Sequence, residues 1–238
     1  MTPIFRNYLT AFWVWCLAHT AVLACELELV IAMDVSRSVD RYEFDLMRYG
    51  TADAFRDPEV IDLIRYMEGG MRVTLTQWSG PKQQKQMIPW SILTSPDTVM
   101  TFAQAIEDME RAYRYDLTAP AEGILHAHDL FSKPKSLCKR RVIDVSGDGV
   151  KNQGSPVRAV TQRLGQSGTT INGLVIQGDR PDPLAFYELE IVSGPMSFIE
   201  IADGYEDFPR AMLRKLIKEM SPLYSEMTAQ TGRKAAAD

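Results

Sequence analysis

The sequence predicts an α/β protein in which a mainly parallel central sheet carries helices on both faces. Apolar runs of strand length alternate with amphipathic runs of helical length along most of the 238 residues, as in parallel sheets. Two strand-like runs, 26–34 and 169–177, are predominantly apolar, which is typical of strands buried on both faces. Hydrophobic residues make up 45% and charged residues 24%, so the chain can bury a full core as one domain or at most two.

The first elements are a strand and two helices. Glu26–Asp34 is a β-rich apolar run that ends abruptly in polar residues, so we expect a central buried strand there. A helix is predicted over Asp40–Phe55, because the apolar residues of this stretch recur with helical spacing. A second, short helix is expected after Pro58, and Gly69 and Gly70 should end it.

A pair of strands and a third helix come next. Met71–Trp78 alternates in strand fashion, and Lys85–Ile92 is its expected partner across a turn at Gly80-Pro81. Ser95-Pro96-Asp97 combines a capping hydroxyl, a proline at the first helical position and an acid in the first turn. These residues predict a helix that runs to about Tyr113.

The remainder of the chain continues the alternation of helices and strands. Ligand sites in such sheets form at the carboxyl ends of strands, so polar residues at these ends are of most interest. The expected elements are a helix from Thr118 through Phe131, a strand over Arg141–Ser146, a helix from Ser155 to Leu164, a strand over Thr169–Gln177, a short helix around Leu184–Val192, an edge strand over Ser197–Ile201 and a last helix over Asp207–Met220.

The first 24 residues have the composition of a secretory signal peptide. Arg6 precedes an uncharged run, Tyr8 to Ala24, and cleavage after Ala24 would leave Cys25 as the new N-terminus. An uncleaved anchor helix and a lipoprotein signal acylated at Cys25 are the alternatives, although a bilayer span needs about 20 apolar residues. We therefore expect an exported protein, periplasmic or secreted, with a signal peptide over 1–24 and a frayed tail over 224–238.

The cysteines agree with export. Cys16 would leave with the signal peptide, so the mature chain keeps Cys25 and Cys138, an even pair in an oxidising compartment. Each precedes a predicted strand, and if the two strands are neighbours the thiols can form a disulfide. Two free thiols are the alternative.

The net charge of −5 provides no basic surface for nucleic acid and suits cations better.

Asp34, Ser36 and Ser38 place one acid and two hydroxyls at alternate positions after the first strand, so their oxygens can converge. Such hard oxygens suit Mg²⁺, Mn²⁺ or Ca²⁺ rather than zinc. On its own, this pattern is better explained by helix capping.

Two further residues complete a larger pattern. Thr118 lies in a loop just before a predicted helix, and Asp148 follows another predicted strand within Ser146-Gly147-Asp148-Gly149. With DxSxS after the first strand, the chain resembles the von Willebrand factor A domain, a Rossmann-like three-layer sandwich with a metal-ion-dependent adhesion site. The resemblance implies that Asp34, Ser36, Ser38, Thr118 and Asp148 hold a divalent cation, with Mg²⁺ expected and Mn²⁺ or Ca²⁺ as alternatives.

A narrower resemblance covers residues 25–223. The stretches CELELVIAMDVSRSVD, AFRDPEVIDLI and CKRRVIDVSGDG are similar to a bacterial family of secreted A-domain-like proteins of unknown function. This resemblance implies a fold and a site, but little about a biological role.

The wider resemblance implies a binding function. In related domains the three hydroxyls bind the ion directly, the two aspartates lie close or act through water, and one coordination position stays open. A Glu or Asp carboxylate of a protein partner fills that position, so the expectation is a metal-dependent protein-binding module of the cell envelope and not an enzyme. A hydrolase that uses the same ion to activate water is the alternative, although the sequence contains no GxSxG, HExxH or phosphate loop.

Several other polar residues call for an interpretation. His126 and His128 are two positions apart on a predicted helix, so they face different directions and are expected to be structural. Asp144 lies inside an apolar strand and should be paired with a basic or backbone donor, or else support the site. Arg37 and Asn152 are expected at the rim of the site, either selecting ligands or as solvated loop residues.

Overall fold

A computed structural model describes residues 25–132, 138–178 and 180–221 of the chain. The predicted signal peptide at 1–24 and the predicted tail at 224–238 lie outside the described residues. Within the described ranges, no helix combines the length and the apolar character that a bilayer span requires.

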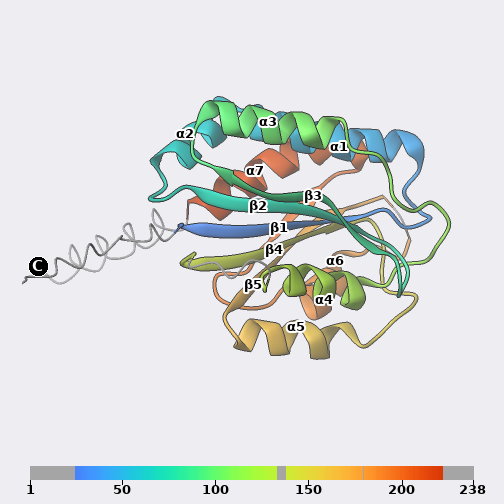
Figure 1. Cartoon of the computed structure of the whole chain (residues 1–238). Helices are drawn as coiled ribbons and strands as arrows, with labels where there is room; N and C mark the ends of the chain where they lie inside the picture. The colour runs from blue at the N-terminus through green and yellow to red at the C-terminus, as the bar shows by residue number, and fades with distance from the viewer. Residues whose placement is uncertain (1–24, 133–137, 179, 222–238) are drawn as a thin grey trace, which may run out of the picture.

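A six-stranded sheet in the order β3-β2-β1-β4-β5-β6 forms the middle of the molecule (Figure 1). β3 runs antiparallel to β2, and the other neighbouring strands are parallel, which confirms the predicted mainly parallel sheet. The strands are β1 (Leu27–Asp34), β2 (Met71–Trp78), β3 (Gln84–Leu93), β4 (Arg140–Gly147), β5 (Thr169–Ile176) and β6 (Ile199–Ala202).

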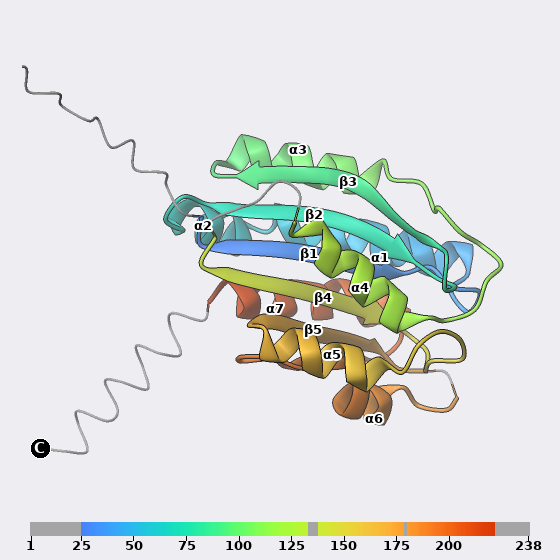
Figure 2. The same ribbon diagram turned by 60° about the horizontal axis from the view of Figure 1, so that its bottom comes forward.

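Helices cover both faces of the sheet and complete a three-layer sandwich. In Figure 2, α4 and α5 lie in front of the strands, and α1 and α7 lie behind them. One face carries α1, α2, α3 and α7, and the other carries α4, α5, α6 and η1. The helical elements are α1 (Arg41–Arg56), α2 (Pro58–Tyr66), α3 (Pro96–Glu107), α4 (Pro120–Leu130), α5 (Val157–Gln166), α6 (Leu184–Phe186), the π-helical η1 (Tyr187–Ile191), the 3-10 turn η2 (Tyr205–Asp207) and α7 (Phe208–Met220).

The central strand β1 is largely apolar because both of its faces are buried. Successive side chains of a strand point to opposite faces, so Ile31 and Met33 of β1 pack in the core beneath α1 and α7. Val30 and Ala32 pack in the opposite core beneath α4 and α5. All eight residues of β1 are buried, so most of them are apolar, and the buried Glu28 pairs with Arg72 and Arg141.

The topology creates a switch point at the carboxyl ends of the central strands. The chain leaves β1 towards α1 on one face of the sheet, and it leaves β4 towards α5 on the other face. β1 and β4 are neighbours, so their connections diverge where Asp34 ends β1 and Asp148 follows β4. Ligands bind at such switch points in open α/β sheets.

The predicted end of the third helix is wrong. α3 ends at Glu107, six residues before Tyr113, and the chain then runs as an irregular segment to α4. The Gln77 side chain replaces the helical hydrogen bonds of this segment, because its amide donates to the Glu110 carbonyl at 3.0 Å and accepts from the Ala112 N–H at 2.7 Å. A tertiary contact therefore overrides the local helical preference.

The predicted disulfide between Cys25 and Cys138 is present. The two residues precede the neighbouring strands β1 and β4, and their Cα atoms are 4.3 Å apart. The bond links the segments that precede β1 and β4, at the amino-terminal end of these strands, opposite the end where Asp34 lies.

Replacing Cys138 by serine should lower the free energy of unfolding by about 3 kcal/mol, because the bond closes a long loop in the unfolded chain. The linked cysteines are 113 residues apart. Urea unfolding of the oxidised proteins measures the loss. Wild type in reductant should unfold like the variant, and reductant should not change the variant further. Equal midpoints for oxidised wild type and the variant would contradict the prediction.

Candidate metal centre

The loop after β1 positions the first three candidate residues. Asp34 ends the strand, and its Oδ1 accepts a hydrogen bond from the Ser36 N–H at 2.7 Å, which curls the chain back over the carboxylate. The Val35 N–H continues the strand pairing by donating to the Trp78 carbonyl at 2.9 Å. Asp34 and Ser36 are fully buried, whereas Ser38 is exposed. The candidate site thus has a buried floor and an open rim.

The structure brings all five predicted residues into one hydrogen-bonded cluster. The Ser36 and Ser38 hydroxyls are 3.3 Å apart, and the Thr118 hydroxyl donates to Ser36 Oγ at 3.2 Å. The Ser38 hydroxyl donates to Asp148 Oδ1 at 2.9 Å. Residues separated by as many as 114 positions therefore lie together where the connections after β1 and β4 diverge.

A clamp between two loops holds Thr118 in this cluster. Its N–H donates to the Asn152 side-chain oxygen at 2.7 Å, and its carbonyl accepts from the Asn152 N–H at 3.1 Å. The Ala119 N–H donates to the Ser79 carbonyl at 3.0 Å and fixes the other side of the loop. Asn152 is exposed at the rim, as expected, but its side-chain oxygen is used to position Thr118.

Two residues that support the cluster, Arg111 and Tyr205, were not predicted from the sequence. The Arg111 guanidinium donates to the Val35 carbonyl at 3.1 Å and to the Ser36 carbonyl at 2.9 Å, so it pins the backbone of the DxSxS loop. The Tyr205 hydroxyl donates to Asp148 Oδ2 at 2.8 Å. Neither residue stands out in the sequence, because Arg111 falls in a stretch predicted as helix and Tyr205 lies in an unremarkable turn.

Burial dominates the electrostatics of the cluster. Removal from water, followed by repulsion from Asp148, raises the pKa of Asp34 to about 8. Burial also raises the pKa of the Tyr187 phenol well above its usual value, with Asp34 as the next cause. A Cβ atom on Gly147 would lie 2.7 Å from the Tyr187 hydroxyl oxygen and 2.9 Å from Asp34 Oδ2, so only glycine fits between them. The floor of the site is thus tightly packed around a carboxylate.

The donor set fits a hard divalent cation. Asp34 Oδ2 is buried and has no hydrogen-bond partner among the described residues, which is costly unless another group offsets its charge. Two carboxylates would balance the charge of a 2+ ion, and three hydroxyls supply neutral oxygen ligands. In the part of the chain that the structure describes, no group of three or more His, Cys, Asp or Glu residues could hold a metal, so hydroxyls would have to share the ligation.

Asp144 and His128, also singled out in the sequence, have structural contacts. Asp144 is fully buried and pairs with Lys215 of α7, with 2.7 Å between Oδ1 and Nζ, which confirms the predicted basic partner. His126 and His128 lie half-buried on α4, and burial lowers the pKa of both. The His128 ring packs edge-on against Phe131, with centroids 6.1 Å apart.

Solved structures with the same architecture have low sequence identity to this chain. Proximal thread matrix protein 1 from the mussel byssus matches with a TM-score of 0.60 and 15% identity over 82% of this chain and 47% of that protein. The PilB minor pilin of Streptococcus sanguinis matches with a TM-score of 0.62 and 13% identity over 83% of this chain and 62% of the pilin. The pilus adhesin SpaC of Lactobacillus rhamnosus GG matches with a TM-score of 0.58 and 12% identity over 82% of this chain and 30% of the adhesin.

These matches show the fold alone, which is von Willebrand factor A-like. The chain spans less than two thirds of the length of each of these proteins. A further structure of the mussel protein is described as having a zinc-occupied MIDAS motif, the metal-ion-dependent adhesion site.

Sequence comparison supplies the family. No curated protein sequence matches the chain closely enough to count as a relative. A family model described as "Protein of unknown function (DUF1194)" matches residues 24–224, which is most of the chain. The chain therefore belongs to the DUF1194 family, whose function is unknown.

Proposed function

We propose that this protein is a metal-dependent protein-binding module of the bacterial cell envelope. Asp34, Ser36, Ser38, Thr118 and Asp148 would hold the divalent cation, with Mg²⁺ expected and Mn²⁺ or Ca²⁺ as alternatives. The observation that carries the proposal is the hydroxyl-rich cluster around a buried carboxylate whose Oδ2 has no hydrogen-bond partner among the described residues.

The chemistry of the side chains favours capture of a carboxylate. When bound, a divalent ion supplies an electrophilic centre to which a Glu or Asp carboxylate of a partner can coordinate. Ser36, Ser38 and Thr118 contribute neutral oxygens, so they do not quench the positive charge. Asp34 and Asp148 balance that charge, and Arg111 and Tyr205 keep the loop and the second carboxylate in place.

The structural neighbours and the disulfide support this proposal. The neighbours are named as a byssal matrix protein, a minor pilin and a pilus adhesin, and one of them has zinc at its MIDAS motif. The disulfide suits an oxidising compartment and therefore export after cleavage of the signal peptide. Because the Cys25 sulfur is part of this bond, the disulfide also argues against acylation of Cys25.

The hydrolase alternative has less support. A metal-dependent hydrolase needs a base that can take a proton from water near neutral pH. The residues that support the cluster are Arg111, Asn152, Tyr187 and Tyr205, and the pKa values of both phenols are raised. Such side chains orient and donate, and Asp34, whose pKa is raised to about 8, is assigned in this proposal to balancing the charge of the cation.

A Ser36→Ala variant tests the proposal. The variant should bind Mn²⁺ at least about 10-fold more weakly in calorimetric titration, because it loses a ligand oxygen. In pull-downs from envelope extract, wild type should retain a partner in Mg²⁺ and release it in EDTA, whereas the variant should not retain it. Ser91→Ala on β3 is the matched control and should behave like wild type. Unchanged Mn²⁺ affinity in Ser36→Ala would overturn the proposal.

A further inference from the structure

A cavity of about 600 Å³ opens beside the candidate metal centre, between the start of α1 and the segment that follows α3. Two of its lining residues connect it directly to the centre. Arg37 stands between Ser36 and Ser38 in the DxSxS loop, and Arg111 donates to the Ser36 carbonyl. The cavity therefore adjoins the rim of the candidate metal centre.

Three arginines line the cavity without an internal partner. Arg37, Arg41 and Arg114 are exposed, and none of their side chains forms a hydrogen bond or an ion pair with the described residues. Arg114 lies close enough to Arg111 that its charge adds to burial in lowering the pKa of Arg111. Placing guanidinium groups together is unfavourable unless an anion offsets their charge, so this grouping indicates an anionic ligand.

Four acidic residues also line the cavity, and one of them, Asp45, is in an ion pair within the wall. The Asp40 carboxylate accepts from the Glu43 N–H at 2.8 Å and caps α1, and Asp45 pairs with Arg48 at 2.8 Å. Asp108 accepts from Gln104 at 3.1 Å.

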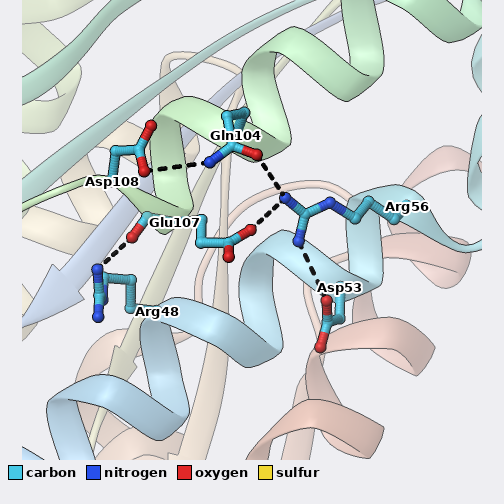
Figure 3. A network of polar contacts seen from close by, with 6 residues as sticks. All are labelled: Arg48, Asp53, Arg56, Gln104, Glu107 and Asp108. Carbon is cyan, nitrogen blue, oxygen red and sulfur yellow. Dashed lines mark hydrogen bonds and ion pairs between the residues drawn. The ribbon is translucent and has the colours of Figure 1, made fainter.

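Figure 3 shows how this wall is held. Arg48 of α1 reaches the Glu107 carbonyl at the end of α3, while Asp108 faces Gln104. Five arginines and four acids therefore line the cavity, an excess of one positive charge, and the side chains of Arg37, Arg41 and Arg114 have no ion pair among the described residues.

We propose that this cavity holds a second acidic side chain of the same extended partner segment whose first carboxylate reaches the metal centre. The ligand class is an acidic peptide with at least two carboxylates. Arginine pairs with carboxylates in a bidentate fork. Tyr115, which lines the cavity, is 84% exposed. Tyrosine and arginine are enriched among the residues that contribute most to the free energy of protein–protein binding. This inference rests on the proposed function.

Two synthetic peptides test it by fluorescence anisotropy in Mn²⁺ at constant ionic strength. One is hexaglutamate, and the other carries a single glutamate among glycines. Wild type should bind hexaglutamate about 10-fold or more tightly than the single-glutamate peptide, since each added ion pair strengthens binding. Arg41→Ser combined with Arg114→Ser should cut this ratio to about threefold or less, while binding of Mn²⁺ and of the single-glutamate peptide stays unchanged.

The control and the contrary outcomes separate the two proposals. Arg65→Ser, at an exposed arginine of α2, should keep the wild-type ratio. If the double variant also keeps that ratio, the second subsite is refuted and the metal-dependent module stands. If EDTA leaves the binding of both peptides unchanged, the proposed function fails, and the subsite fails with it.

Discussion

Replacing Lys215 by methionine is expected to lower the free energy of unfolding by about 3–5 kcal/mol, the usual result of breaking a buried ion pair. The Lys215 side chain is fully buried on α7, where its ammonium contacts Asp144 and Glu219. The Asn172 side chain also donates to Glu219, at 2.9 Å, and completes the cluster. Without the ammonium, two buried carboxylates would share a low-dielectric space with no cation between them.

Urea unfolding at pH 8 and at pH 5 measures this effect. Burial already raises the pKa of Asp144 to about 7, and loss of Lys215 would raise it further. The deficit should therefore be larger at pH 8 than at pH 5, where the carboxylates can take up protons. Arg214→Met is the matched control, because Arg214 is exposed and its partner Glu200 also contacts Arg210, so the loss should be no more than about 1 kcal/mol. A loss below about 1 kcal/mol in Lys215→Met would show that the pair contributes little.

The sequence predicted this cluster only in part. An acid inside the apolar strand β4 implied a buried partner, because an unpaired charge there would be too costly. It did not reveal which residue, since Lys215 occupies an amphipathic helix in which a lysine ordinarily faces solvent. The pairing depends on how α7 crosses β4 and β5, and that placement is a property of the whole packed layer.

The fold and the candidate site were also predicted only in part. Hydrophobic period and turn residues predicted the parallel sheet and its two helical layers, because these patterns reflect which faces are buried. The five clustered residues were predicted from a resemblance. The Arg111 and Tyr205 contacts were not predicted, because they join single residues from irregular segments. The end of α3 was misplaced for a related reason, since a side chain of β2, Gln77, decides it.

Asp34→Asn is expected to have opposite effects on metal affinity and on stability. The substitution keeps an oxygen to accept the Ser36 N–H, but it removes one of the two charges that would balance a divalent cation. Mn²⁺ affinity should fall by about 100-fold or more. In metal-free buffer at pH 8, the variant should instead be more stable than wild type by on the order of 2–5 kcal/mol, because a buried charge beside Asp148 is gone.

The sign of the pH dependence follows from the pKa of Asp34, which is raised to about 8. A carboxyl whose pKa is raised on folding stabilises the native state below its unfolded value near 4, and this stabilisation is lost as the pH rises through about 8. The advantage of Asp34→Asn should therefore be small at pH 5 and largest at pH 8.

Thermal unfolding with EDTA and with Mn²⁺ at both pH values measures these differences, with Asp62→Asn on the exposed face of α2 as the matched control. Mn²⁺ at about 100 times its wild-type dissociation constant should add about 2.7 kcal/mol to wild type and at most about 0.4 kcal/mol to Asp34→Asn. If Asp34→Asn is the less stable protein in EDTA at pH 8, or if Mn²⁺ stabilises both proteins equally, Asp34 does not balance a bound cation. A buried carboxylate that destabilises the metal-free protein is understandable at this position only if a cation normally offsets its charge.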